Sequence, residues 1–508
     1  MVDVIVIGAG SAGAVIAARA SEDPSREVLL LEAGPDYPDL ATLPHDLRNG
    51  HENSYTAHDW GLRHAPTGAR TMAFPRGRVT GGSSAVNTTI ALRGMPEDYD
   101  GWAELGSPGW AFDHVLPAFR RLERDLDFGD ETFHGDAGPI SIRRYTDREL
   151  VPVQRAFLDA ADALGYPSCP DANAPFDWGA GPQPMNKLGR QRISCAVAYL
   201  APARIRENLT IRAHSLVRRL LVERGRCTGV EVESRDGSTE QLRARLVVLC
   251  AGAIMSPAIL LRSGIGPRDE LAQLGIEPLA DVPAVGRNLC DHPALSVVCA
   301  ARDPDAIDLD GPLIQTILRY TAPGSEHRND LQIEPISFVR DRTQARFSIA
   351  AILEHTYGSG SLRLRSADPH AAPLIEHRFC EDPRDAARLA TALSDAIAFA
   401  RSGPMAALIS EVVFPDLARK TDGAALAELC RRFAGSGFHP CGTVKMGPRT
   451  DPDAVVDARG RCHAIDQLVV ADASITPTVP RANTNLTAIM IGEQIGEWIR
   501  TQPATYGL

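Results

Sequence analysis

The sequence predicts an α/β fold in which a domain built on a parallel sheet is interleaved with an α+β domain built on an antiparallel sheet with helices. Two apolar runs near the amino end, residues 2–7 and 27–32, are separated by a glycine-rich turn and a helix-like stretch. This order is typical of a parallel strand–helix–strand unit. Later in the chain, residues 330–339 and 345–354 alternate between apolar and polar side chains, which indicates antiparallel strands.

Length and composition are those of a globular protein with two domains. The chain has 508 residues, which is longer than one hydrophobic core usually supports. Its residues are 44% hydrophobic and 23% charged, a composition that argues against disorder. The net charge of −11 argues against a nucleic-acid partner. We find no secretory signal and no apolar stretch that could span a membrane. Ten scattered cysteines indicate reduced thiols rather than disulfides or a metal site, so we expect a cytoplasmic protein without a metal.

The glycine-rich turn fits a dinucleotide-binding motif. Residues 8–13 read Gly-Ala-Gly-Ser-Ala-Gly, the GxGxxG pattern, between the first apolar run and the helix-like stretch. Gly8 permits the turn, Gly10 lets the backbone approach a pyrophosphate, and Gly13 lets the helix lie close to the sheet. Glu32 ends the second run, where an acid accepts hydrogen bonds from a ribose hydroxyl. Glycine turns also arise for packing alone, but the strands and the acid favour a Rossmann-like domain for NAD or FAD. Its predicted binding residues are Gly8, Gly10, Ser11, Ala12, Gly13, Glu32 and Ala33.

Further segments carry a recognisable pattern. Residues 77–87 read GRVTGGSSAVN, and residues 252–266 read GAIMSPAILLRSGIG. The tail carries GFHPCGTVKMG at 437–447 and VVADASITPTVPRANTNLTAIMIGE at 469–493. In this order they resemble the glucose–methanol–choline (GMC) family of FAD-dependent alcohol oxidoreductases, whose second signature is met at every constrained position. The first signature is met except at Thr80, where an aliphatic residue is usual.

The resemblance implies FAD as the cofactor and assigns further residues to it. Family members place a glycine–serine loop along the flavin and pyrophosphate, an aspartate near the ribityl chain, and the last helix at the flavin. The residues implied here are Arg78, Gly81, Gly82, Ser83, Asn87, Val217, Ala251, Gly252, Asp472, Ala473, Thr484 and Asn485. Members that attach FAD covalently use a histidine just before the loop asparagine. That place holds Val86, so we expect non-covalent FAD.

The same resemblance implies a catalytic pair. The histidine of the family's H-x-x-G-T-like turn matches His439, and the second residue, at the turn into the last helix, matches Asn483. Asn485 is the rival assignment, and helix capping is an alternative role for either asparagine. An alcohol carbon that loses hydride must develop alkoxide character, so its hydroxyl needs a proton acceptor, which a neutral imidazole provides. Phe438 is expected to line the pocket. The segment 285–292, VGRNLCDH, also matches the family and is interpreted as architectural.

The domains are expected to interleave along the chain. FAD-binding segments are predicted at 1–150 and 191–300, with a substrate-side insertion at 151–190. The substrate-binding domain is predicted at 301–434, and residues 435–508 return to the FAD domain with the catalytic His and Asn.

The resulting functional hypothesis is oxidation of a primary alcohol to the aldehyde, with His439 as base and O2 as electron acceptor. The run LERDLDFGDETFHGDAGPISI, residues 122–142, resembles aryl-alcohol and hydroxymethylfurfural oxidase-like members and equally mycofactocin-associated dehydrogenases. An alternative is therefore a dehydrogenase that passes electrons to a quinone, mycofactocin or another acceptor. A lyase or photoenzyme on the same scaffold and a non-catalytic flavoprotein are the alternatives from other classes. A nicotinamide dehydrogenase is disfavoured, because it leaves the loop and tail motifs unexplained.

Overall fold

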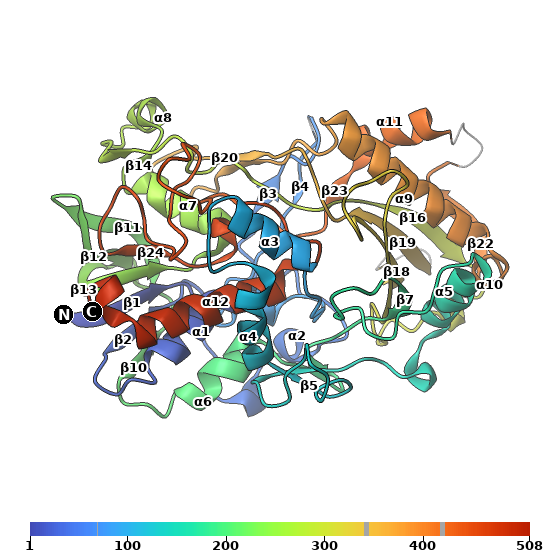
Figure 1. The fold of residues 1–508 in the computed structure, drawn as a ribbon, viewed down its shortest axis with the longest axis horizontal. Helices are drawn as coiled ribbons and strands as arrows, with labels where there is room; N and C mark the ends of the chain where they lie inside the picture. The colour runs from blue at the N-terminus through green and yellow to red at the C-terminus, as the bar shows by residue number, and fades with distance from the viewer. Residues whose placement is uncertain (69, 340–344, 417–421) are drawn as a thin grey trace.

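The computed structural model describes residues 1–68, 70–339, 345–416 and 422–508. The structure contains two large sheets, which lie at opposite ends of the molecule in Figure 1. Both chain termini lie at the outer end of the first sheet (Figure 1). The described part of the chain confirms the predicted α/β class with an antiparallel second sheet.

The first sheet is parallel at its centre. Its strands β1 (Val2–Ile7), β2 (Val28–Leu31), β10 (Leu209–Arg212), β13 (Thr239–Leu249) and β24 (Leu468–Val470) pair in parallel in the order β10-β2-β1-β13, with β24 on β13. Val4 to Val6 are fully buried, as expected for a strand that is covered on both faces. The remaining members are β11 (Leu216–Glu223) and β12 (Arg226–Glu233), which extend the sheet as antiparallel strands.

Three helices begin near the carboxyl ends of the parallel strands. They are α1 (Ser11–Ala20), which follows β1, α7 (Gly252–Arg262), which follows β13, and α12 (Thr484–Thr501). Helices α1 and α12 pack so closely that a Cβ atom at Gly492 would lie 2.8 Å from the Ala12 carbonyl oxygen. Helix amino ends at this edge of a sheet form the usual position for binding phosphates.

The second sheet is antiparallel, with strand order β22-β16-β19-β18-β17-β7 and β23 on β16. Its strands are β7 (Gly179–Pro182), β16 (Pro293–Ala301), β17 (Thr316–Tyr320), β18 (Leu331–Val339), β19 (Arg346–Leu353), β22 (Ile409–Phe414) and β23 (Gly435–Ser436). One face packs in a hydrophobic core with α5 (Pro152–Ala163), α9 (Pro383–Arg401) and α11 (Gly423–Phe433). The other face is turned toward the first domain and contributes to the site described below.

The remaining helices and strands are mostly short. The helices are α2 (His45–Arg48), α3 (Pro96–Glu104), α4 (Phe112–Leu122), α6 (Ala201–Ala203), α8 (Arg268–Gln273) and α10 (Gly403–Ala406). The strand pairs are β3 (Arg63–His64) with β4 (Met72–Ala73), β5 (Glu123–Asp125) with β6 (Ile140–Ile142), β8 (Lys187–Leu188) with β9 (Gln191–Arg192), β14 (Ile265–Gly266) with β15 (Ala280–Asp281), and β20 (Ser361–Arg363) with β21 (Leu374–Glu376).

Sheet membership can be compared with the predicted domain bounds. Strand β7 lies in the second sheet, in keeping with a substrate-side insertion at 151–190. Strand β16 also lies in the second sheet, although the predicted segment 191–300 contains most of it. After β7, the next strand of the second sheet therefore begins at Pro293, because the chain crosses to this sheet directly after the family segment 285–292. The domain division as a whole stays a prediction.

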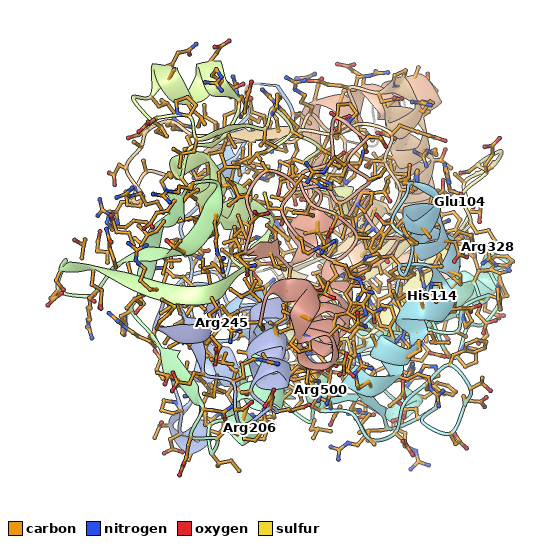
Figure 2. All side chains as sticks on the ribbon, turned by 60° about the vertical axis from the view of Figure 1, so that its left-hand side comes forward. Glu104, His114, Arg206, Arg245, Arg328 and Arg500 are labelled. Atoms are coloured by element: carbon orange, nitrogen blue, oxygen red, sulfur yellow. The ribbon has the colours of Figure 1, made fainter. Side chains whose placement is uncertain are left out.

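The surface mixes acidic and basic side chains. Arginines that Figure 2 labels illustrate this, because Arg245, Arg328 and Arg500 pair with Asp3, Glu97 and Glu497. Such exposed pairs add little stability but neutralise the arginines locally. Among the helices within the described ranges, none combines the length and apolar character that a membrane crossing requires.

Candidate active site

A cavity of about 530 Å³ lies between the two sheets and collects most of the residues singled out above. Its lining includes nineteen of the twenty-two predicted site residues: Gly8, Gly10, Ser11, Ala12, Glu32, Ala33, Gly82, Ser83, Asn87, Val217, Ala251, Gly252, Phe438, His439, Asp472, Ala473, Asn483, Thr484 and Asn485. The other three, Gly13, Arg78 and Gly81, are not among the lining residues. Segments that are several hundred residues apart in the chain thus meet around one space.

The glycine turn and Glu32 form the wall made by the first sheet. Gly8 has a left-handed φ of 93°, and a Cβ at Gly13 would lie 2.0 Å from the Gly8 carbonyl oxygen, so both positions require glycine. The Glu32 carboxylate accepts hydrogen bonds from the backbone N–H groups of Ala9 at 3.0 Å and Gly34 at 2.9 Å. Burial raises the pKa of Glu32 to about 7 in spite of these bonds.

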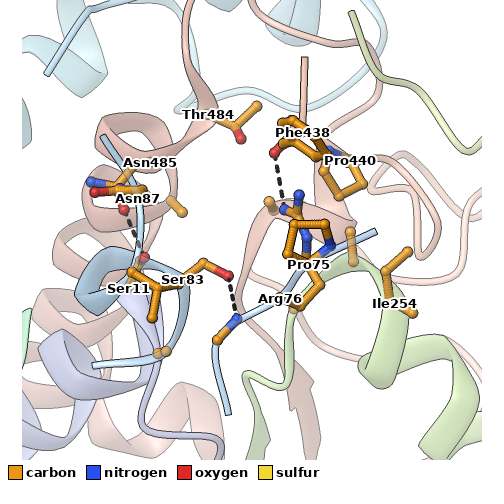
Figure 3. A pocket seen from close by; sticks show the side chains of 18 of the residues that line it. Ser11, Pro75, Arg76, Ser83, Asn87, Ile254, Phe438, Pro440, Thr484 and Asn485 are labelled. Atoms are coloured by element: carbon orange, nitrogen blue, oxygen red, sulfur yellow. Dashed lines mark hydrogen bonds between the residues drawn. The ribbon is translucent and has the colours of Figure 1, made fainter. Parts of the chain in front are cut away.

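The loop of residues 77–87 lies directly against the glycine turn. A Cβ at Gly82 would approach the Gly10 Cα to 2.6 Å, so the two backbones touch. Figure 3 shows Ser83, whose hydroxyl accepts a hydrogen bond from the Gly77 N–H at 3.2 Å. Arg78 places its guanidinium 4.8 Å from the centre of the Trp60 ring and so supports the loop from outside the cavity.

The amino end of α12 closes the opposite side. Asn485 accepts a hydrogen bond from Ser11 at 2.8 Å, as Figure 3 shows, and its Nδ2 is buried without a partner among the described residues. Asp472 accepts hydrogen bonds from the Gly252 N–H and the Ser256 hydroxyl, at 2.8 and 2.6 Å, and thereby ties α7 to the tail.

His439 and Asn483 face each other in the cavity. Asn483 Nδ2 lies 3.0 Å from His439 Nε2, and the Asn483 side chain makes no capping hydrogen bond to α12. Asn485 is instead bonded to Ser11, so Asn483 is the asparagine that meets the histidine. Burial and the neighbouring His292 lower the pKa of His439 to about 3, which keeps the imidazole neutral at pH 7.

Asp291 and His292 support His439 from behind. Both belong to the segment 285–292, which the sequence suggested was only architectural. The Asp291 carboxylate accepts hydrogen bonds from the backbone N–H groups of His439 at 2.8 Å and His292 at 2.7 Å. The two imidazoles meet through their Nδ1 atoms at 2.9 Å. If Asn483 donates to Nε2, then Nδ1–H of His439 donates to His292. No motif marked Asp291 as a partner of His439, because the two segments meet through pairing between distant parts of the chain, namely β16 with β23 and an isolated bridge between Cys290 and Cys441.

The turn before His439 is held in an uncommon backbone conformation. Phe438 has a φ of 66°, in the left-handed region that non-glycine residues seldom adopt. Its N–H donates to the Ser436 hydroxyl at 2.7 Å, and its carbonyl oxygen accepts from Arg76 at 2.9 Å (Figure 3). These bonds fix Phe438 in the cavity wall and set the direction of the following histidine.

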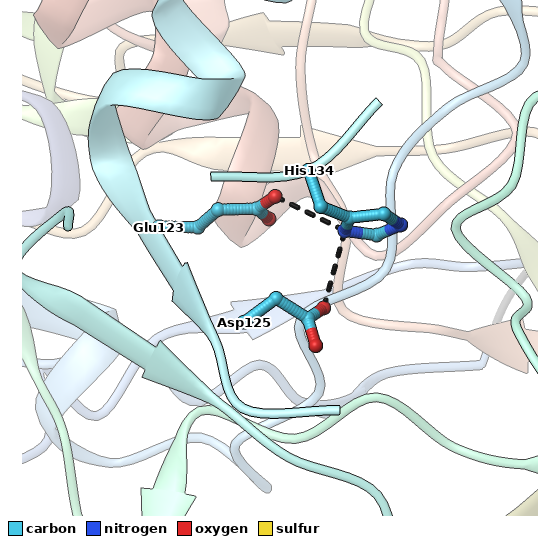
Figure 4. A group of neighbouring side chains, drawn as sticks. All are labelled: Glu123, Asp125 and His134. Carbon is cyan, nitrogen blue, oxygen red and sulfur yellow. Dashed lines mark hydrogen bonds and ion pairs between the residues drawn. The ribbon is translucent and has the colours of Figure 1, made fainter. Parts of the chain in front are cut away.

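A cluster of buried charges lies away from the cavity, in the run 122–142. Figure 4 shows His134 facing Glu123 and Asp125. Its Nδ1 lies 3.1 Å from Glu123 and 3.2 Å from Asp125, and its Nε2 lies 2.9 Å from Asp171. Burial alone would lower the pKa of His134, but hydrogen bonds to these carboxylates raise it to about 10. Arg144 also pairs with Asp125. The imidazole is thus a cation whose nitrogens both carry protons. It serves as an ion-pair partner of the carboxylates rather than as a ligand of a metal ion.

We predict that His134→Gln destabilises the protein by about 3 kcal/mol, because it removes one of the three cations of the cluster and leaves only Arg93 and Arg144 to balance its buried carboxylates. The stabilisation from His134 is complete below its unfolded pKa of about 6.5 and is lost as the pH rises toward the folded value of about 10. Denaturant midpoints at pH 6, 8 and 10 test this. The wild type should lose stability across this range and the variant should lose less. His114→Gln, at an exposed histidine, is the control, and equal midpoints for all three proteins would contradict the prediction.

Comparison with known families decides the identity. The amino-terminal family model of GMC oxidoreductases matches residues 2–294, and the carboxyl-terminal model matches residues 356–492. The chain is a GMC oxidoreductase. The predicted family and its oxidoreductase class are thus confirmed.

Relatives of this GMC oxidoreductase match over nearly their full length. It is 36% identical to the 5-(hydroxymethyl)furfural oxidase of Methylovorus sp., over 98% of this chain and 99% of that protein. It is 34% identical to an oxygen-dependent choline dehydrogenase of Rhizobium etli, over 98% of this chain and 95% of that protein. The solved structure of pyridoxine 4-oxidase from Mesorbium loti is 31% identical, with a TM-score of 0.90 over 98% of this chain and 99% of that one.

The cavity of the GMC oxidoreductase fits FAD, the cofactor of this family. The backbone contact between Gly10 and Gly82 leaves no Cβ atom where a pyrophosphate would pass. The amino ends of α1 and α12 both open on the cavity and favour negative charge there. The unpartnered Nδ2 of Asn485 is a further donor for the cofactor.

Proposed function

We propose that this chain oxidises a primary alcohol to the aldehyde, with His439 as the base, FAD as a non-covalent cofactor and O2 as the electron acceptor. The observation that carries the proposal is the pair of His439 Nε2 and Asn483 Nδ2, which lie 3.0 Å apart in the cavity wall. The lowered pKa of His439 keeps the imidazole unprotonated at neutral pH, which a general base requires before it accepts the substrate proton.

The pair suits an alcohol oxygen. An oxygen that binds between the two side chains can donate its proton to His439 Nε2 and accept a hydrogen bond from Asn483 Nδ2. Bound FAD supplies the acceptor for the hydride that leaves the carbon. Asn483 orients the oxygen without competing for the proton, and the imidazolium that forms holds the developing aldehyde oxygen in place.

The names of the relatives support the reaction class. Two are called oxidases, of hydroxymethylfurfural and of pyridoxine, and the third an oxygen-dependent choline dehydrogenase. All three names are consistent with alcohol oxidation, and the oxidases favour O2 as acceptor.

Val86 lines the cavity where family members with covalent FAD have a histidine, which supports a non-covalent cofactor. All ten cysteines are buried free thiols, which is in keeping with a cytoplasmic location.

The proposal is tested by mixing the yellow holoprotein with a panel of primary alcohols without oxygen and following the flavin absorbance. We expect bleaching by at least one alcohol, then rapid recovery with stoichiometric peroxide when air is admitted. Slow recovery in air that an artificial quinone accelerates would mean that the electron acceptor is not O2. No bleaching by any alcohol would overturn the oxidation itself and favour a lyase or photoenzyme. Acid precipitation should release all of the flavin into the supernatant.

We predict that Asn483→Ala slows anaerobic flavin reduction by about 10- to 100-fold, because one hydrogen bond to the reacting oxygen is lost. Stopped-flow absorbance at saturating alcohol measures this rate. Asn485→Ala is the matched comparison, since the same residue type two positions on is bonded to Ser11. It should weaken FAD binding and leave the reduction rate of the loaded enzyme within about threefold. The reverse pattern would assign the catalytic role to Asn485.

A further inference from the structure

The second sheet supplies its own wall of the cavity, and that wall contains one acid. The wall is formed by one side of β16, β19 and β18, which contributes Ala294, Ser296, Ala350, Ile352, Glu334 and Ile336. The alternate residues of the same strands, such as Ile333 and Ile349, pack in the core beneath α9. Within the described ranges, Glu334 is the single ionisable residue among these six lining positions.

The sheet register leaves space in front of Glu334. Ser296 pairs with Ala350 across β16 and β19, and Ala350 pairs with Glu334 across β19 and β18. The three residues therefore form a row on one face of the sheet, in which two side chains are small. A ligand in the cavity can reach the carboxyl group over this row.

Glu334 is costly to bury in its present surroundings. It is 6% exposed, and Gln183 on the neighbouring loop donates to its Oε1 from Nε2 at 3.2 Å. Burial raises the pKa of Glu334 to about 8. Within the described ranges no Lys, Arg or His forms an ion pair with it. A carboxyl group in such a wall destabilises the empty site, and a cationic ligand would compensate by pairing with the ionised form.

We propose that Glu334 is the specificity residue of the substrate site, and that the preferred substrate is a primary alcohol that also carries a protonated amino group. The ammonium group pairs with the Glu334 carboxylate while the hydroxymethyl group lies between His439 and Asn483. A second hydroxyl group in place of the ammonium group would make only a neutral hydrogen bond to Glu334 and leave its carboxyl group protonated. Such a substrate would gain less binding free energy from the site. The inference rests on the proposed alcohol oxidation and narrows its substrate class.

The test compares two alcohols of nearly equal shape, 3-(aminomethyl)benzyl alcohol and 3-ethylbenzyl alcohol, with the FAD-loaded enzyme. We expect kcat/KM of the wild type to be about 10- to 100-fold higher for the amine. Glu334→Gln should remove this preference by lowering the value for the amine alone. Glu334→Leu should in addition raise the value for 3-ethylbenzyl alcohol. Asp395→Asn, an acid on α9 behind the same sheet, is the matched control and should keep the wild-type preference.

Two results would overturn the inference: equal values for both alcohols in the wild type, or an amine preference that persists in Glu334→Gln. A binding measurement separates this failure from failure of the oxidation. Calorimetric titration of the holoenzyme with 3-methylbenzylamine, which has no hydroxyl, should show binding that Glu334→Gln weakens by at least 10-fold. Such binding without flavin bleaching by any alcohol would keep the role of Glu334 and overturn the oxidation. Bleaching without amine binding would keep the oxidation and overturn the role of Glu334.

Discussion

Replacing His439 by alanine should slow anaerobic flavin reduction by about 1,000-fold, within the range of 10²- to 10⁴-fold that general-base catalysis contributes. The imidazole is the neutral group whose Nε2 faces Asn483 in the cavity, so its removal leaves the hydroxyl proton without an acceptor. Rapid mixing with excess alcohol under nitrogen gives the rate. The FAD content of the purified protein should stay near one per chain. In the proposed mechanism His439 contacts the alcohol, and it does not belong to the glycine turn that is predicted to bind FAD.

The pH dependence of the wild-type reduction rate tests the proton transfer to His439. Because the pKa of His439 is lowered to about 3, the wild-type reduction rate should be level between pH 6 and pH 8 and fall only under strongly acidic conditions, where the base becomes protonated. An acid limb near pH 6.5 would show that the imidazole keeps its ordinary pKa. His114→Ala, at an exposed histidine that Figure 2 labels, should retain the full rate. A His439→Ala rate within about tenfold of wild type would assign the base to another group.

The sequence was most informative where the functional residues lie close together along the chain. The turn at 8–13 and the acid at Glu32 follow one another along a single strand–helix–strand unit, so their spacing alone predicts that they meet. His439 and Asn483 are 44 positions apart, and only the family resemblance brought them together before the structure did. Their catalytic roles remain predictions that the variants above test.

The residues that the sequence did not reveal are those whose partners depend on strand pairing between distant segments. Asp291 contacts His439 across 148 positions, and Gln183 contacts Glu334 across 151. Alternation in β18 does indicate which of its residues share a face. It does not say whether Gln332 and Glu334 face a helix or a cavity, because that depends on which element covers each side of the sheet. The available signal in the sequence was an acid on an alternating strand, and this signal did not indicate whether the acid faces the cavity.

Two neighbouring glycines should give opposite results when each is changed to alanine. A Cβ at Gly13 would lie 2.0 Å from the Gly8 carbonyl oxygen and 2.9 Å from the Cys250 Cβ. Gly13→Ala must therefore displace the helix from the sheet, and we expect a loss of about 2 kcal/mol or more in stability, with or without cofactor. A Cβ at Gly10 would meet only the Gly82 Cα, at 3.9 Å, and the Gly10 backbone, with φ of −78°, suits an alanine. The protein alone therefore has room for Gly10→Ala.

The methyl group at position 10 would, however, stand in the cavity where the backbone is predicted to approach the FAD pyrophosphate. Gly10→Ala should fold with the apoprotein melting temperature of the wild type and bind FAD about 100-fold more weakly, which corresponds to about 2.7 kcal/mol. Thermal melts of apoprotein and FAD titrations of both variants separate the two effects. Unchanged FAD affinity in Gly10→Ala would mean that the cofactor does not pass close to this turn. A lowered apoprotein melting temperature would mean that Gly10 is required for packing, as the simpler interpretation of a glycine-rich turn holds. The contrast thus distinguishes a glycine kept for the fold from a glycine kept for the ligand, which the GxGxxG pattern alone does not.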